Sequence, residues 1–296
     1  MMRRSFLALS GAVAARGRDI PRFSFAVLTD IHFADLPPLG KRDYRGSWER
    51  LARAVEAINQ ARPAFTIQLG DLVDSGRYSL ARILPLYEAL TMRRYHVLGN
   101  HDFPNGRVEL SSRLGMERAW YDFAVRGWRL VILDGMDISV AGRAGGTAEH
   151  DAAAEWLRKN ADRPNAKDWN GAIGRNQLNW LRGVLARARE RRERVIVFCH
   201  LPVLRESSTE QHVAWNCDEI RASLEESGVV AAYLNGHDHN GGYAERDGIH
   251  YVTFPGMVES GVKNSYTLVD VFADRLQLRG SGTAASRTLA LGQTIA

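Results

Sequence analysis

Five short blocks rich in aspartate and histidine lie in order along the chain and contain the ligand types of a two-metal hydrolase. Mixed carboxylate, imidazole and amide ligands suit Mn, Fe or Zn better than Ca or Mg. Such ions can neutralise a phosphate and activate the water that attacks it. The blocks are Asp30-Ile31-His32, Gly70-Asp71-Leu72-Val73-Asp74, Gly99-Asn100-His101-Asp102, His200-Leu201-Pro202 and Gly236-His237-Asp238-His239.

Each block directly follows an apolar run that is typical of a β-strand. A three- or four-residue match arises easily by accident, so the placement of the blocks carries the argument. Ligands in open α/β sheets collect beyond the carboxyl ends of the strands, and five strands would therefore deliver all five blocks to one rim. The predicted strands are residues 23–28, 64–69, 95–98, 195–199 and 229–234.

Seven side chains in these blocks are candidate metal ligands, and we expect them to hold two divalent ions. Asp71 is expected to bridge the ions and to set their separation. The ions are expected to be Mn, with Fe or Zn as alternatives. One ion would bind Asp30, His32, Asp71 and His239. The other would bind Asp71, Asn100, His200 and His237.

His101 stands beside the predicted ligand Asn100 and is the candidate to stabilise the transition state or to protonate the leaving group. Either Asp102 or Asp74 could orient its imidazole. Both aspartates could equally cap loops, and the sequence does not choose between these roles. His101, Asp102 and Asp74 are therefore the candidate catalytic residues.

The composition is that of an ordinary globular domain, with 45% hydrophobic and 25% charged residues. No Pro/Ser-rich linker divides the chain, so we predict one domain over residues 21–296. Two cysteines imply no disulfide framework. Arginines within residues 182–194 contribute to the net charge of +5. No aromatic residues interleave with them, which favours an exposed helix face over a nucleic-acid site.

Residues 1–20 are predicted to be a leader outside the domain. Arg3 and Arg4 precede a short apolar stretch, a pattern that resembles a twin-arginine export signal and predicts a periplasmic protein. The alternative is a disordered basic leader on a cytoplasmic protein. No stretch of the sequence approaches the ~20 apolar residues needed to span a bilayer, so no integral membrane segment is expected.

Between and after the blocks, the pattern alternates helices with strands and then adds hairpins. Ser47 could cap a helix that Pro63 ends. Together these elements predict an α/β fold with two mixed β-sheets packed face to face and helices outside. Further helices are expected at residues 80–90, 150–160 and 176–192, with a short one ending at 226. Hairpins are expected at residues 120–125 with 128–133, 243–245 with 249–254, and 266–271 with 276–278.

The five blocks resemble the calcineurin-like metallophosphoesterase superfamily, whose pattern is Asp-x-His, Gly-Asp-x-x-Asp, Gly-Asn-His-Asp/Glu, a lone His, and Gly-His-x-His. All seven ligand positions of that pattern are filled in this chain. The resemblance implies a four-layer α/β/β/α sandwich. It also implies the ligand assignment given above.

A narrower similarity, from about residue 23 to 280, is to the manganese-dependent ADP-ribose/CDP-alcohol diphosphatases. It is carried by stretches outside the ligand set, namely Asn170-Gly171, Ala214-Trp215-Asn216 and Asn240-Gly241-Gly242-Tyr243. The resemblance implies a substrate in which a nucleoside diphosphate is joined to another alcohol, such as ADP-ribose or CDP-choline. Cleavage of its pyrophosphate would give a nucleoside monophosphate and a phosphorylated alcohol. His32 is a departure, because animal members have glutamine there.

A nucleoside substrate needs an aromatic face on which its base can stack, worth ~1 to 3 kcal/mol. Phe33, Trp215 and Tyr243 lie close in sequence to the blocks and are the candidate stacking residues, although each could instead be part of the core. Asn240, directly after the last block, is also a candidate substrate-binding residue.

Two other functions stay open at this point. The same metal ligands could serve a phosphodiesterase acting on cyclic nucleotides or phospholipid head groups. A metal-free scaffold that binds a partner protein is the alternative from another class, but a scaffold has no need of a complete ligand set. The sequence says nothing about the oligomeric state.

Overall fold

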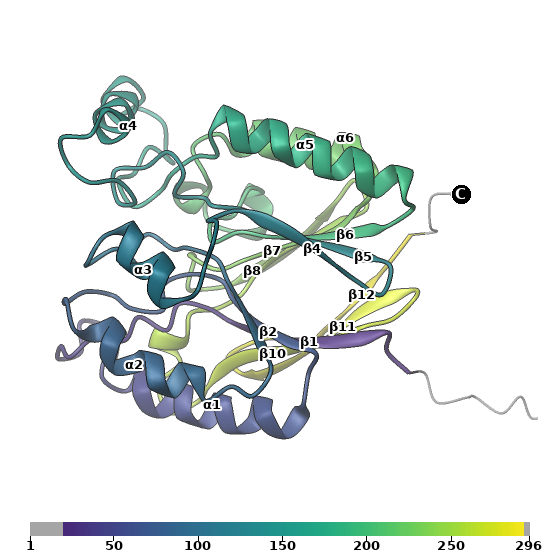
Figure 1. Ribbon diagram of the computed structural model, residues 1–296, viewed down its shortest axis with the longest axis horizontal. Coiled ribbons are helices and arrows are strands. Elements are labelled where there is room, and N and C mark those ends of the chain that lie inside the picture. Colours follow the sequence, from purple (N-terminus) through teal and green to yellow (C-terminus); the bar gives the residue numbers. More distant parts are fainter. Residues whose placement is uncertain (1–19, 293–296) are drawn as a thin grey trace, which may run out of the picture.

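Two six-stranded β-sheets pack face to face in the computed structural model, which describes residues 20–292 (Figure 1). The first sheet has the order β12-β11-β10-β1-β2-β3 and the second the order β4-β5-β6-β7-β9-β8. Helices cover both outer faces, so the predicted four-layer α/β/β/α sandwich is confirmed.

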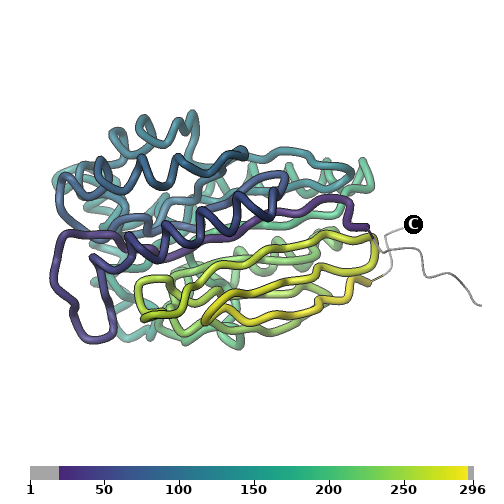
Figure 2. The backbone as a smooth tube through the Cα atoms, turned by 90° about the horizontal axis from the view of Figure 1, so that it is seen from below, coloured from purple at the N-terminus to yellow at the C-terminus, as the bar shows by residue number. Residues whose placement is uncertain are grey.

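The strands of the first sheet are β1 (Phe23–Leu28), β2 (Phe65–Gln68), β3 (Arg93–His96), β10 (Ser265–Val271), β11 (Arg275–Gly282) and β12 (Arg287–Ala290). Those of the second sheet are β4 (Tyr121–Val125), β5 (Trp128–Ile132), β6 (Arg194–Phe198), β7 (Val230–Asn235), β8 (Gly242–Arg246) and β9 (Ile249–Thr253). β1 pairs with β10, so the first strand of the chain lies beside a strand from near its end (Figure 2).

Parallel pairing aligns the strand ends that carry the blocks. β1, β2 and β3 are parallel neighbours in the first sheet. β5, β6, β7 and β9 are parallel neighbours in the second. The five blocks follow β1, β2, β3, β6 and β7, so they emerge at the carboxyl ends of adjacent parallel strands. This is the edge at which an open α/β sheet presents its ligands.

Helices α1 (Ser47–Ala61) and α2 (Ser79–Glu88) cover the first sheet, and α5 (Arg175–Glu190) and α6 (Cys217–Ser227) cover the second (Figure 1). Two further helices, α3 (Arg107–Arg113) and α4 (Ala148–Lys159), lie beside them near the strand ends. Three short 3-10 helices are η1 (Arg205–Ser207), η2 (Glu210–His212) and η3 (Met257–Glu259).

The start of α1 differs from its prediction by one residue. The cap position is Gly46, and the predicted cap Ser47 is the first residue of the helix. The Asp43 carboxylate accepts the Gly46 N–H at 3.1 Å, which fixes the turn that leads into the helix. The helix ends at Arg62 in the left-handed conformation, directly before Pro63.

Two of the predicted hairpins are closed by turns of the same type. Arg126 and Gly127 have φ values of 44° and 83°, and Asp247 and Gly248 have 50° and 73°. Positive φ at both central residues defines the type I′ turn, whose twist matches that of the flanking strands. Besides the three 3-10 helices, the described elements that the sequence did not predict are α3 and β12, both of which are short.

The predicted leader lies almost wholly outside the described residues, so the export signal and the boundary at residue 20 stay predictions. Within residues 20–292, no helix combines the length and the apolar character needed to cross a membrane.

Phe25 should be a main anchor of the layer between the sheets. Its ring is fully buried, stacks on Phe65 with centroids 5.1 Å apart and meets the edge of Phe198 at 5.7 Å. We expect Phe25→Ala to lower the free energy of unfolding by about 3 to 5 kcal/mol through the cavity it creates. Urea denaturation would measure this. Val108→Ala, at an exposed site, should change stability by less than about 0.5 kcal/mol; similar effects of the two changes would contradict the assignment.

Candidate metal centre

The seven predicted ligands come together at the carboxyl ends of five strands, although they span more than two hundred residues. Their side-chain donor atoms form two groups that share one carboxylate. Asp30 and His32 follow β1, Asp71 follows β2, Asn100 follows β3, His200 follows β6, and His237 and His239 follow β7.

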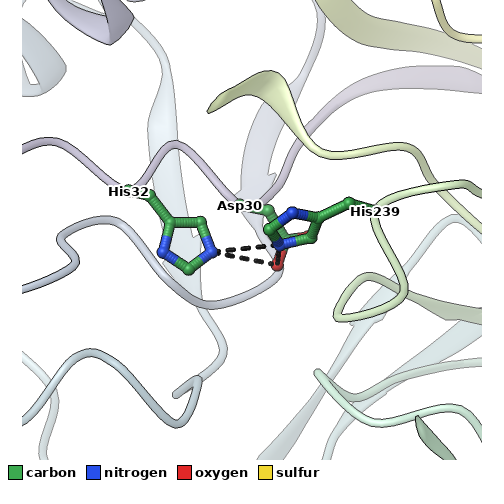
Figure 3. A group of neighbouring side chains, drawn as sticks. All are labelled: Asp30, His32 and His239. Atoms are coloured by element: carbon green, nitrogen blue, oxygen red, sulfur yellow. Dashed lines mark hydrogen bonds and ion pairs between the residues drawn. The ribbon is translucent and has the colours of Figure 1, made fainter. Parts of the chain in front are cut away.

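The first group contains Asp30, His32 and His239, whose donor atoms point toward one another (Figure 3). The Nε2 atoms of His32 and His239 are 3.1 Å apart. Asp30 Oδ1 lies 3.3 Å from His239 Nε2 and 3.7 Å from His32 Nε2. All three side chains are almost fully shielded from solvent.

The second group contains Asp71, His200 and His237, joined by Asn100. His200 Nε2 lies 3.1 Å from His237 Nδ1 and 3.1 Å from Asn100 Oδ1. Asp71 Oδ2 is 3.3 Å from His200 Nε2 and also 3.3 Å from His32 Nε2. One carboxylate oxygen therefore faces both groups, as a bridging ligand would.

The donor set fits divalent transition-metal ions. Two imidazole nitrogens about 3 Å apart can share only one proton, and this arrangement occurs in both groups. Imidazoles and carboxylates aimed at common points, with an amide oxygen beside them, are the ligands that Mn, Fe and Zn sites use. We therefore identify these side chains as the candidate ligands of the metal ions.

Each ligand histidine uses its second ring nitrogen to contact a fixed partner. His32 Nδ1 lies 3.1 Å from Asp74 Oδ1, and His239 Nδ1 lies 3.3 Å from Glu259 Oε1. Such contacts fix the tautomer and the ring direction of metal-binding histidines. The partners of the remaining two are the Leu69 carbonyl oxygen, 2.8 Å from His200 Nδ1, and Asn170 Oδ1, 2.8 Å from His237 Nε2.

Burial and close charges shift the titration of these groups. Burial opposes charge on Asp71, but the imidazoles of His200 and His32 outweigh it and hold the pKa of the carboxyl well below its usual range. Burial and then repulsion from His200 keep the pKa of His237 well below its ordinary value. Burial disfavours charge on His239, yet Asp30 raises its pKa to about 10. A cation binding here would therefore displace protons.

Four of the ligands occupy the left-handed region of backbone space. The φ values are 49° at Asp30, 47° at His32, 57° at Asp71 and 72° at His237. Aspartate and histidine are among the residue types that tolerate this region best. The turns after β1, β2 and β7 thus direct their ligands back over the strand ends, where an ordinary extended chain would carry them away.

Gly99 is required by the close approach of two blocks. A Cβ at this position would lie 2.1 Å from Asp71 Oδ1 and 2.4 Å from the Asp71 backbone nitrogen. The Gly-Asn-His block can therefore pass beside Gly70-Asp71 only without a side chain at that point.

Among the candidate catalytic residues, the structure separates Asp74 from Asp102. His101 Nδ1 lies 3.3 Å from Asp74 Oδ1, and its ring meets His32 edge-on with centroids 4.7 Å apart. Asp102 instead accepts backbone N–H groups of Gly99 and Asp71, each at 2.9 Å. The expectation that Asp102 could orient His101 is therefore corrected: its buried carboxylate needs donors and finds them in the backbone of two blocks, which it ties together.

An open cleft of about 720 Å³ lies over the candidate ligands and His101. It contains one guanidinium, that of Arg42, among the described residues that line it. The other walls of the cleft include Val140, His150, Asp168, Trp169 and His212.

Two of the predicted stacking residues, Trp215 and Phe33, lie outside the lining of this cleft, which corrects that expectation. Trp215 is buried, with its ring stacked on Trp156 at 4.6 Å. Phe33 is buried against Trp48, beside a separate hollow. Large aromatic rings near a strand end gain more by joining the core than by lining a wet cleft.

The other two substrate-binding candidates, Tyr243 and Asn240, are not among the described residues that line the cleft, and each contacts a neighbouring residue instead. The Tyr243 hydroxyl lies 3.1 Å from Nδ1 of His250, which is a residue of β9. This contact holds the Tyr243 ring against that strand. Asn240 donates its backbone and side-chain N–H groups to Asp238 Oδ1, which closes the last block into a turn. Trp169 does line the cleft, although nothing in the sequence selects it beyond its place directly before Asn170.

A two-sheet α/β sandwich with clustered carboxylate and imidazole donors at its strand ends defines the class of metal-dependent phosphoester hydrolases. Consistent with this, residues 23–241 match the family model described as calcineurin-like phosphoesterase. The chain belongs to the calcineurin-like phosphoesterase family and is a hydrolase of phosphoester or anhydride bonds.

Similar proteins extend over nearly the whole chain. A manganese-dependent ADP-ribose/CDP-alcohol diphosphatase from Oryza sativa is 32% identical, with 92% of this chain and 95% of the rice protein covered. The protein of the same name from Arabidopsis thaliana is 33% identical over 88% of this chain and 94% of its own length. The crystal structure of a dimetal phosphatase from Danio rerio superposes with a TM-score of 0.85 at 28% identity, covering 92% of this chain and all of that one.

Removal of the shared carboxylate should reduce metal binding. In Asp71→Asn the side chain keeps its shape but loses the charge that both groups share, so we expect fewer manganese ions per chain than in the unaltered protein. Elemental analysis after dialysis against Mn would measure the difference. Asp168→Asn removes a carboxylate from the same cleft but outside the ligand groups, and should retain full metal content. A folded Asp71→Asn protein with undiminished manganese would rule out the bridging assignment.

Proposed function

We propose that this protein uses two divalent ions, manganese by preference, to cleave the pyrophosphate bond of nucleoside diphosphate derivatives of the ADP-ribose and CDP-choline type. The observation that carries the proposal is the pair of ligand groups sharing the Asp71 carboxylate beneath an open cleft. Relatives with the manganese-dependent diphosphatase name, at 32% and 33% identity over almost their full length, support the substrate class.

When bound, the ions would supply an activated water and neutralise charge on the phosphate. The side chains of the protein hold the groups that contact the phosphate in position. Asp74 holds His101 at the cleft wall beside the ligands, where its imidazole can donate a hydrogen bond to a phosphate oxygen. Burial lowers the pKa of His101, which favours a neutral ring at neutral pH. A neutral imidazole still donates one N–H, so His101 can stabilise developing charge without a net proton transfer.

The cleft also offers a place for the nucleoside base. Trp169 is 39% exposed and lines the cleft together with His237. Its neighbour Asn170 contacts His237 through Oδ1 and donates its side-chain N–H to the carbonyl oxygens of Asn165 and Gln211. The indole is therefore attached to a fixed segment next to a ligand, and its face is available for stacking.

A substrate panel tests the proposal directly. The manganese-loaded protein should convert ADP-ribose to AMP and ribose phosphate, and CDP-choline to CMP and phosphocholine, faster than it hydrolyses cyclic AMP or bis(p-nitrophenyl) phosphate. Replacing manganese with magnesium should lower the rate, because the imidazole-rich donor set suits the softer ion. Faster turnover of cyclic AMP or of the diester would overturn the assignment in favour of a phosphodiesterase.

Trp169 should determine how tightly the nucleotide binds. We expect Trp169→Ala to raise KM for ADP-ribose about tenfold through the lost stacking energy, with a smaller effect on kcat. Steady-state kinetics would measure both constants. Trp48→Ala is the matched control, since Trp48 is exposed to a similar degree, 40% against 39%, and lines a different hollow. Equal KM changes in the two variants would show that Trp169 does not bind the base.

A further inference from the structure

We propose that Arg42 binds the phosphate next to the one that is attacked, and so makes the site selective for a diphosphate over a single phosphodiester. This inference rests on the proposed function and names a specificity residue for it. Arg42 is not part of any of the five blocks, and it lies in the loop between β1 and α1.

The loop places Arg42 at the cleft. In Figure 2 the dark purple segment after β1 extends beyond the strand ends before it turns back into α1. Leu39 and Arg42 exchange backbone hydrogen bonds of 2.9 and 3.0 Å, which close the loop just before the arginine. The Arg42 side chain then lines the cleft together with His32, His101 and His239.

The guanidinium is oriented by two carboxylates that also hold ligand histidines. Arg42 Nε lies 3.5 Å from Glu259 Oε1, and the same oxygen contacts His239 Nδ1. Arg42 Nη1 lies 3.9 Å from Asp74 Oδ1, which contacts His32 Nδ1. Both distances exceed the ~2.7 to 2.9 Å of a strong charge-assisted hydrogen bond. The carboxylates thus direct the guanidinium without using its donors fully.

The exposure of Arg42 leaves those donors accessible. Its side chain is 35% exposed at the cleft, whereas the Asp74 carboxylate is only 12% exposed. A guanidinium carries five N–H donors in a planar fork that matches two oxygens of a phosphate. Two neighbouring arginines are arranged differently, because Arg45 and Arg82 both bind Asp35 closely, at 2.7 and 2.5 Å, around the separate hollow.

In pyrophosphate cleavage, the positive charge of Arg42 would stabilise the departing phosphate. The water oxygen forms a bond to one phosphorus, the bond from that phosphorus to the bridging oxygen breaks, and its electron pair stays on the departing phosphate. The proton of the water passes to solvent. The departing phosphate monoester has a second pKa of about 6, so it can leave as a dianion. It needs positive charge more than a proton, and Arg42 lies where such charge would act on a second phosphate.

The test compares two substrates that use the same metal ions. Steady-state kcat/KM is measured for ADP-ribose, which has a second phosphate, and for bis(p-nitrophenyl) phosphate, which has none. We expect Arg42→Met to lower the ratio of the two values by about 10- to 100-fold, the range for a lost hydrogen bond between charged partners. Arg42→Lys should recover part of the ratio, since lysine retains the charge but not the planar fork. Arg45→Met, in the same loop but outside the cleft, should leave the ratio unchanged.

Binding supplies a readout independent of turnover. In calorimetry with the manganese-loaded protein, α,β-methylene-ADP should bind more tightly than AMP, and Arg42→Met should remove most of that difference. An unchanged substrate ratio, or an unchanged preference for the methylene diphosphate in a folded Arg42→Met protein, would overturn the role of Arg42. If the unaltered protein failed to cleave ADP-ribose while hydrolysing the diester, the proposed function would fail, and the Arg42 proposal with it.

Discussion

The structure depends on one carboxylate, that of Asp71, which is buried where the ends of both sheets meet. A buried carboxylate is costly unless charges and hydrogen bonds compensate it. One oxygen of Asp71 faces His32 from the first sheet and His200 from the second, each at 3.3 Å. The other accepts the His101 N–H at 2.8 Å. The need to surround this charge therefore joins segments from four different strands.

The turns that surround Asp71 are themselves strained. Residues other than glycine with positive φ cost about 1 to 3 kcal/mol each when their conformation is rarely populated, and such residues cluster at functional sites. Asp30, His32, Asp71 and His237 all have positive φ. Their cost is offset by the backbone hydrogen bonds that fix the turns, among them His32 N–H to the Asp71 carbonyl oxygen at 2.9 Å and Asp71 N–H to Asp102 at 2.9 Å. Asp102 thus serves the metal centre by holding its backbone.

Most of the architecture could be predicted from the sequence because the signals are local. Apolar runs followed by aspartate or histidine predict strands that end at a site, and β1 has the predicted bounds while the other four such strands differ by a few residues. The short elements α3 and β12 escaped prediction, since seven and four residues carry little periodicity. The long hydrophobic faces of α1 and α5 left no such ambiguity.

The environment of individual polar and aromatic residues was harder to predict. Trp169 and Trp215 both lie in loops, and only the packing of α4 decides that Trp215 meets Trp156 while Trp169 faces the cleft. Asp74 and Asp102 both end a block, yet the direction of their turns gives one an imidazole partner and the other backbone partners. Sequence spacing specifies where a chain goes more reliably than where each side chain points.

The two ends of the cleft give the site a direction. Arg42 lies near His32 and His239, because it contacts the same two carboxylates as these imidazoles do. Trp169 lies near His237, because the adjacent residue Asn170 contacts that imidazole. A nucleoside diphosphate has the same polarity, with an aromatic base at one end and a second phosphate beyond the first. Because Glu259 and Asp74 contact both Arg42 and ligand histidines, a phosphate that draws the guanidinium toward itself also alters the partners that orient those imidazoles. In the proposed role of Arg42, recognition of the second phosphate would be coupled, through two carboxylates, to the geometry of the ligands beneath the first.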